Sequence, residues 1–154
     1  MPKRNENHTV IPEFTVIEDN NGQFTGINIV GKTISDMILL GGVAGKDSIR
    51  VDGYLLICFT DGNILGLSSY DETFYANYNY RTDTEEFRQE TANRSLNGSF
   101  ADKTVGKKVV SSSFNGRAIS GSPQTLSIEL DNGIDILFEA SFSDNTLNVS
   151  LQRR

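Results

Sequence analysis

The sequence has a single cysteine, Cys58, a single histidine, His8, and no tryptophan. One thiol cannot form an intramolecular disulfide, so nothing favours a disulfide-stabilised secreted domain. One histidine and one cysteine also cannot supply the ligands of a structural zinc site. Because His8 lies in a polar tail, a Ser-His-Asp or Cys-His site would lack a rigid base. These shortages predict a protein that is not an enzyme and that binds no metal and no cofactor.

Long apolar runs are absent as well. No stretch of 18 apolar residues occurs, and the N-terminal sequence MPKRNENHTV lacks the apolar segment of a signal peptide. We therefore expect a soluble, cytoplasmic protein without membrane attachment.

The formal net charge is −6, and an acidic surface repels phosphates, which disfavours general nucleic-acid binding. A basic protein partner is compatible with this charge.

Proline is scarce, with three residues in 154, whereas Asn, Ser, Thr and Gly are plentiful. This composition favours hairpins over helix bundles. The length suits one domain with a core of its own. We predict a disordered tail over residues 1–9, followed by a single β-rich domain over residues 10–154.

Two hairpins organise the chain. In Val51–Leu67, two apolar runs flank Asp61-Gly62, a dipeptide typical of a type I′ turn, which needs positive φ at both central residues. The pattern recurs in Thr125–Phe138, with Asn132-Gly133 at the turn. Each hairpin follows a Gly-Lys dipeptide and a further apolar strand, so residues 29–70 and 104–142 form a candidate internal repeat.

One segment between these units is typical of a helix. Thr82 or Asp83 can cap its start, Phe87 belongs to a thin apolar stripe that would lie on the sheet, and Gly98 marks its end. We therefore predict a mainly β fold of the α+β class. It would be an antiparallel sheet or half-barrel built from two repeated strand-plus-hairpin units, with one short helix near residues 83–97.

Three groups of residues resemble functional sites without matching one. Gly41–Ser48 resembles a phosphate-binding loop, but Asp47 stands where that loop needs a hydroxyl, so we interpret it as a flexible connection. The Gly-Lys dipeptides at 31–32 and 106–107 could hold an anion, although glycine kinks at strand starts explain them as well. Four carboxylates on the second hairpin favour a solvated face over a calcium or acid–base site; they are Glu129, Asp131, Asp135 and Glu139.

The strongest candidate binding segment is rich in aromatic residues. Tyrosine and arginine are frequent anchors of binding surfaces, and the polar spacing predicts a long loop. Several of these rings could instead cover the sheet. The candidate binding residues are Tyr70, Phe74, Tyr75, Tyr78, Tyr80 and Arg81.

Two functions fit these observations best. In the first, the chain is an acidic, non-enzymatic inhibitor or immunity-type protein that masks another protein, a basic one by charge. In the second, it sequesters a small, nucleotide-like ligand in a pocket formed by the aromatic residues with Arg81, Lys32 or Lys107. An enzyme of unfamiliar type is the weakest interpretation. The sequence does not predict the oligomeric state.

Overall fold

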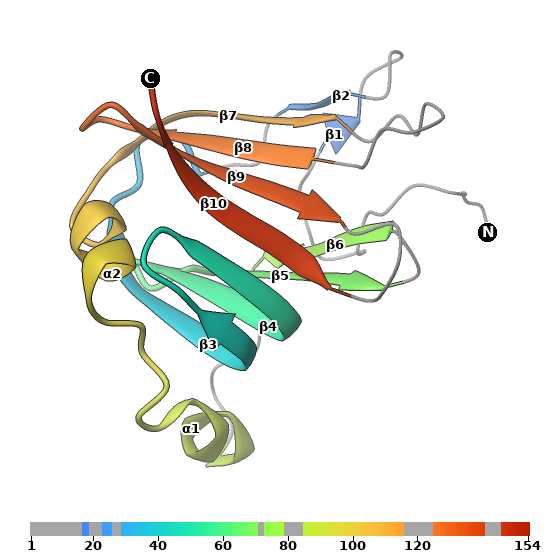
Figure 1. Cartoon of the computed structure of the whole chain (residues 1–154), viewed down its shortest axis with the longest axis vertical. Helices are drawn as coiled ribbons and strands as arrows, with labels where there is room; N and C mark the ends of the chain where they lie inside the picture. The colour runs from blue at the N-terminus through green and yellow to red at the C-terminus, as the bar shows by residue number, and fades with distance from the viewer. Residues whose placement is uncertain are drawn as a thin grey trace.

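The computed structural model describes residues 17–18, 23–25, 29–70, 73–78, 85–115, 125–140 and 146–154. Within them the chain is mainly β, as predicted, with antiparallel strands and two short helices (Figure 1). In chain order, the elements are β1 Ile17–Glu18, β2 Gln23–Thr25, β3 Ile34–Ala44, β4 Ser48–Phe59, β5 Ile64–Tyr70, β6 Thr73–Tyr78, α1 Glu85–Thr91, α2 Ser99–Thr104, β7 Val109–Asn115, β8 Thr125–Leu130, β9 Ile134–Ala140 and β10 Leu147–Arg153.

The sheet runs in the order β1-β2-β7-β8-β9-β10-β4-β5-β6, and β3 pairs with β4 outside this path. Because β3 occupies one edge of β4, strands β10 and β5 must share the other edge. The N-terminal half of β4 pairs with β10 at Ser48–Val51, and its C-terminal half pairs with β5 at Leu55–Cys58. Strand β4 therefore joins the two halves of the sheet.

Glycines permit the change of direction in the β3–β4 hairpin. The register shifts between Leu40 and Gly42, where Gly41 has φ 101°. A Cβ on Gly53 would lie 2.0 Å from the carbonyl oxygen of Leu40, so only glycine fits at this close approach. The hairpin can thus leave β5 and bring its tip to β10.

The two predicted hairpins form, but their turns are not of type I′. Gly62 and Gly133 have positive φ, whereas Asp61 and Asn132 do not. The N–H of Gly62 donates to the carbonyl of Phe59 at 3.0 Å, which indicates a type I turn followed by a left-handed glycine. The side chains explain the difference: Asp61 accepts the N–H of Asn63 at 3.0 Å, and Asn132 accepts that of Ile134 at 3.2 Å.

The two Gly-Lys segments lie side by side. The N–H of Gly31 donates to the carbonyl of Val109 at 2.8 Å, and the N–H of Gly106 donates to Ile34 at 2.7 Å. Both glycines have nearly the same φ, 89° and 88°. The strands that follow each carry a register shift two residues after their start, at Asp36 and Ser111. That the two units arose by duplication stays a prediction.

The main core lies inside the curved sheet. Its buried side chains come from β3 to β5 and from β7 to β10, and they include Leu55, Ile57 and Phe138. Helix α2 adds Phe100, whose side chain is almost completely buried. In Figure 1, α2 lies beside one end of the strands. The core therefore continues from the sheet onto α2.

Several predicted element bounds are wrong. The helix expected near 83–97 is confined to Glu85–Thr91, and Gly98 precedes α2 rather than ending the first helix. Asn93 adopts a left-handed conformation with φ 61°, which prevents α1 from continuing. Strands β1 and β2 form a short antiparallel pair, with Ile17 opposite Thr25. The predicted tail over 1–9 and the N-cap residues Thr82 and Asp83 lie outside the described residues.

Candidate functional site

A cleft opens on the outer face of the sheet, between α1 and the β3–β4 hairpin. Its volume is about 390 Å³, and it is open to solvent. Two strands, the last turn of α1 and the segment that follows it provide the lining, which consists of Leu40, Gly41, Tyr54, Glu90 and Arg94. We regard this cleft as the candidate binding site.

The floor of the cleft follows from the alternation of β4. Leu55 and Ile57 point into the main core, so Tyr54 and Leu56 lie on the opposite face. Leu40 is the register partner of Tyr54 and lies on the same face. Leu40 is half-buried, whereas Tyr54 is 43% exposed. The floor is thus apolar, and its aromatic side chain remains accessible.

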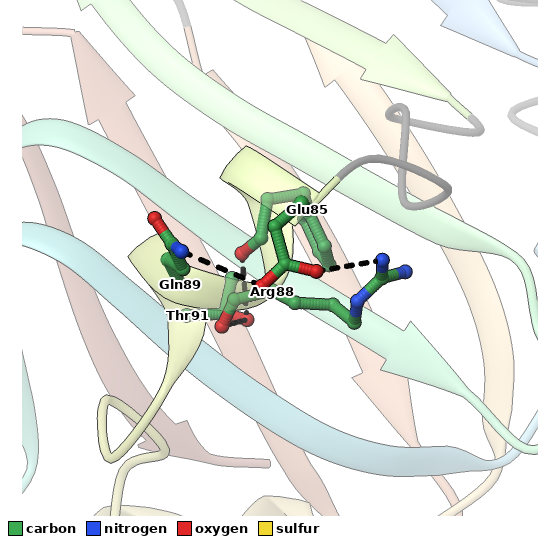
Figure 2. Close-up of polar contacts among 5 residues, drawn as sticks. Glu85, Arg88, Gln89 and Thr91 are labelled. Carbon is green, nitrogen blue, oxygen red and sulfur yellow. Dashed lines mark hydrogen bonds and ion pairs between the residues drawn. The ribbon is translucent and has the colours of Figure 1, made fainter.

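Helix α1 packs on this outer face. Its Phe87 packs against a small buried cluster formed by Ile38, Leu56 and Ile64. The outward face of α1 is polar: Glu85 pairs with Arg88 at 3.0 Å and accepts a hydrogen bond from Gln89 at 3.4 Å (Figure 2). The helix therefore lies on the sheet through an apolar contact, as its thin apolar stripe predicts.

The chain after α1 is fixed to the edge of β3. The N–H of Leu39 donates to the carbonyl of Arg94 at 3.2 Å, and the N–H of Leu96 donates to Met37 at 2.7 Å. The hydroxyl of Ser95 donates to Asp36 at 2.8 Å. These bonds hold Arg94 beside the cleft.

Two opposite charges line the wall of the cleft. Glu90 and Arg94 are both exposed, and neither makes an ion pair among the described residues. Arg88 differs, because Glu85 already neutralises it. An aromatic floor beside a cation and an anion that lack ion-pair partners in the described part of the chain can hold an apolar group and a charged group at once.

The sheet register links this cleft to the predicted aromatic segment. The pairing of β4 with β5 ends at Leu55 and Leu67, which are the chain neighbours of Tyr54 and Ser68, and Ser68 pairs with Tyr75 across β5 and β6. Leu40 and Tyr54 therefore form one cross-strand pair, and Ser68 and Tyr75 form another beyond the end of the β4–β5 pairing. The first of these two pairs lines the cleft.

The predicted long loop from Tyr70 to Arg81 is wrong. Tyr70 ends β5, and Phe74, Tyr75 and Tyr78 belong to β6, which pairs with β5 from Thr73 onward. Tyr80 and Arg81 lie outside the described residues. Cross-strand pairing prevails here because tyrosine and phenylalanine favour strands when a neighbouring strand is available.

The lysines predicted to join an aromatic pocket do not line the cleft. Lys32 pairs with Asp61 at the first hairpin turn, and this ammonium lowers the pKa of the Asp61 carboxyl. Lys107 lies in the backbone pairing between the two Gly-Lys segments, where its carbonyl accepts the N–H of Ile34 at 2.9 Å. The structure thus explains both dipeptides by their place at strand starts.

Two carboxylates of the second hairpin form ion pairs with an arginine of the same chain. Arg154 pairs with both Glu129 and Asp135. Asp131 accepts the backbone N–H of Lys108 at 3.2 Å. Among the described residues, no three His, Cys, Asp or Glu side chains are grouped so that they could hold a metal ion.

The segment that resembles a phosphate-binding loop is a hairpin tip. Gly41–Ala44 continues β3 instead of forming the expected flexible connection, and the N–H of Gly45 donates to Ser48 at 2.7 Å. A strand follows, whereas a phosphate-binding loop needs a helix there. Asp47 pairs with Lys103 of α2 at 2.9 Å, which lowers its pKa.

Cys58 is not in the main core. It is half-buried on the outer face and packs against the cluster beneath α1. Burial, with a smaller effect of the Asp36 charge, raises the pKa of its thiol to about 11. A thiol of this kind is a poor nucleophile, so Cys58 is better interpreted as a small hydrophobic residue.

Comparison with protein-family models, with curated proteins and with solved structures finds no match for this chain. In the part of the chain that the structure describes, no helix has the length and apolar character needed to span a membrane.

Sequence reasoning missed the residues of the cleft. Leu40 and Tyr54 are in apolar runs that indicate only strands, and Glu90 and Arg94 are in a segment that reads as a polar helix surface. The alternation of side chains along β4 could have predicted that Tyr54 lies on the other face of the sheet from Leu55 and Ile57. The meeting of these residues depends on tertiary structure.

Proposed function

We propose that this chain is a cytoplasmic, non-enzymatic binding protein that masks another protein, in the manner of an inhibitor or immunity protein. The observation that carries the proposal is the cleft itself, in which exposed Tyr54 lies beside Glu90 and Arg94, two charges without an ion-pair partner among the described residues. Tyrosine and arginine in a partly enclosed position are the residue types that anchor protein interfaces.

Charge supports the choice of partner. The chain carries a net charge of −6, and the exposed residues Glu85 and Glu86 begin α1, whose Glu90 lines the cleft. A partner with a basic face would be attracted to this side, and its association rate would fall as salt increases.

One observation favours the second candidate, a module that sequesters a small ligand. A volume of about 390 Å³ lies within the range of small-molecule sites, and a nucleotide-like ligand could stack on Tyr54 with its phosphate near Arg94. The open shape of the cleft favours the protein partner, because small-molecule sites usually enclose most of their ligand.

Native mass spectrometry of the protein freshly isolated from its own cells tests the proposal. We expect a protein partner to co-purify with the chain. The affinity of the chain for that partner should fall by about 2 kcal/mol in Tyr54→Ala, because the aromatic anchor is lost. Val110→Ala is the matched control, since Val110 is 44% exposed but does not line the cleft.

The alternatives give different spectra. A released small molecule, with no protein partner, would establish sequestration instead of masking. Equal binding by Tyr54→Ala and the parent protein, with both fully folded by circular dichroism, would move the interface away from the cleft.

A further inference from the structure

The outer edge of β3 is open from Gly41 to Ala44 in the described part of the chain. Strand β4 pairs along the other edge of β3. The segment Arg94–Leu96 covers the outer edge only beside Met37 and Leu39, with a bridge between Ile38 and Ser95. Helix α1 diverges from the edge at this point, and the cleft occupies the space between them.

The open edge presents backbone groups for pairing. Gly45 donates to Ser48 in the hairpin, so the alternation of an antiparallel ladder directs the N–H and C=O groups of Gly42 and Ala44 outward. Protein edges are usually protected by lysine, proline or inward charges. Here the sequence is Gly-Gly-Val-Ala, and Val43 is 68% exposed.

We propose that this edge and the cleft together bind an extended C-terminal segment of another protein, which adds to β3 as an antiparallel strand and places its terminal carboxylate at Arg94. This inference rests on the proposed masking function and specifies its partner. The existing pairing of Arg94–Leu96 already uses the same edge in the antiparallel sense, so the added strand extends an arrangement that the fold contains.

The direction of the strand explains the need for a chain end. A segment antiparallel to β3 runs from Ala44 toward Gly41, and its C-terminal end arrives where Arg94 already occupies the edge. A segment from the middle of a partner chain would have to turn away from the edge at Arg94, whereas a C-terminal segment can end at that point. The Arg94 guanidinium has no carboxylate partner among the described residues, and a terminal carboxylate would supply one.

The floor of the cleft sets the preferred side chain. Alternate residues of an added strand face the outer side of the sheet, where Leu40, Tyr54 and Val43 present apolar surface. An aliphatic residue at the end of the segment would contact this surface. The preferred segment is therefore extended, β-branched and apolar at its C-terminal residue.

A peptide titration tests the inference. The full ¹⁵N-labelled chain would be titrated with acetyl-Ser-Thr-Val-Thr-Val as the free acid and as the C-terminal amide. We expect saturable shifts of the amide signals of Gly41–Ala44, with about tenfold tighter binding of the free acid. Arg94→Gln should abolish that advantage. Arg88→Gln should keep it, because Arg88 pairs with Glu85 and does not line the cleft.

Several results would overturn the inference. These are the absence of saturable shifts at Gly41–Ala44 for both peptides, equal affinity of the two forms, or an unchanged preference in Arg94→Gln. Sedimentation velocity without peptide provides a further test: self-association abolished by Val43→Asp would assign the edge to a second copy of this chain. The titration needs no natural partner, so a negative result would rule out this docking mode alone. The masking proposal would still be tested separately by native mass spectrometry.

Discussion

Cys58 illustrates how one residue takes its chemistry from its position. Its neighbours on β4, Ile57 and Phe59, point into the main core, so alternation places the thiol on the outer face. There it contacts the cluster that Phe87 joins, with Asp36 directly opposite in the ladder. Desolvation and the nearby carboxylate both disfavour the thiolate.

This position predicts slow alkylation of Cys58. Its pKa is raised from 9.0 to about 11, so at pH 8 the thiolate fraction falls about 100-fold relative to an unperturbed thiol. We expect iodoacetamide to react at least about 100-fold faster in urea than with the native protein. The measurement is the alkylation rate followed by mass spectrometry. Equal native and unfolded rates would contradict the burial of this thiol.

The same thiol affects stability with a definite sign. The folded-state pKa is above the unfolded value, so the unfolded chain loses its proton first as pH rises. The native state should therefore lose stability above about pH 9, while the thiol should contribute no pH dependence near neutrality. Urea unfolding of Cys58→Ala provides the comparison, because that variant lacks the titrating group.

At the scale of elements, β6 shows how register separates two tyrosines that look alike in the sequence. Tyr78 pairs with Leu65, a fully buried core residue, whereas Tyr75 pairs with half-buried Ser68 on the face of the cleft. Directly paired residues share a face of the sheet. The register therefore places Tyr78 opposite a core residue and Tyr75 opposite a residue outside the core.

This assignment predicts opposite effects of two substitutions. Tyr78→Ala should lower the free energy of unfolding by about 3 kcal/mol, because the register partner of Tyr78 is the core residue Leu65. Tyr75→Ala should cost less than about 1 kcal/mol in stability and should weaken partner binding instead. Urea denaturation of both variants provides the measurement. A larger loss in Tyr75→Ala would mean that the register of β6 is shifted by one residue.

Elements also differ in how far the sequence predicts them. Asp61-Gly62 and Asn132-Gly133 identify both hairpins, because a left-handed glycine is a local requirement that the sequence states directly. Helix α2 was not predicted, since six residues after Gly98 carry no strong helical pattern. Burial of Phe100 stabilises it, and Thr104 donates to the carbonyl of Phe100 at 2.9 Å. Such a helix depends on the core around it.

The same limit applies to strands and to the cleft. Gly41 and Gly42 argue against a strand by propensity, yet β3 extends through them because the close approach of β4 needs residues without side chains. The cleft combines residues about 50 positions apart in the chain, such as Leu40 and Arg94. Periodicity identifies the face of each element, but the packing of α1 on β3 decides which faces meet.

For the whole molecule, the two predicted units share one core. The main cluster contains Leu55 and Leu67 from the first unit and Leu126 and Phe138 from the second. Backbone pairing joins the units directly at the Gly-Lys segments, and β10, which follows the second unit, joins them indirectly because it pairs with both β9 and β4. Neither unit can therefore bury its apolar face without the other, which agrees with the small size of each one.

A shared core predicts one cooperative unfolding transition. Differential scanning calorimetry should give a single peak with equal calorimetric and van't Hoff enthalpies. Fragments 1–80 and 81–154 should each lack dispersed amide signals when prepared alone, because each would expose the apolar face that the other covers. Two separate transitions, or one fragment that unfolds cooperatively by itself, would show that the β4–β10 pairing joins two independent domains and that the common core contributes little to either.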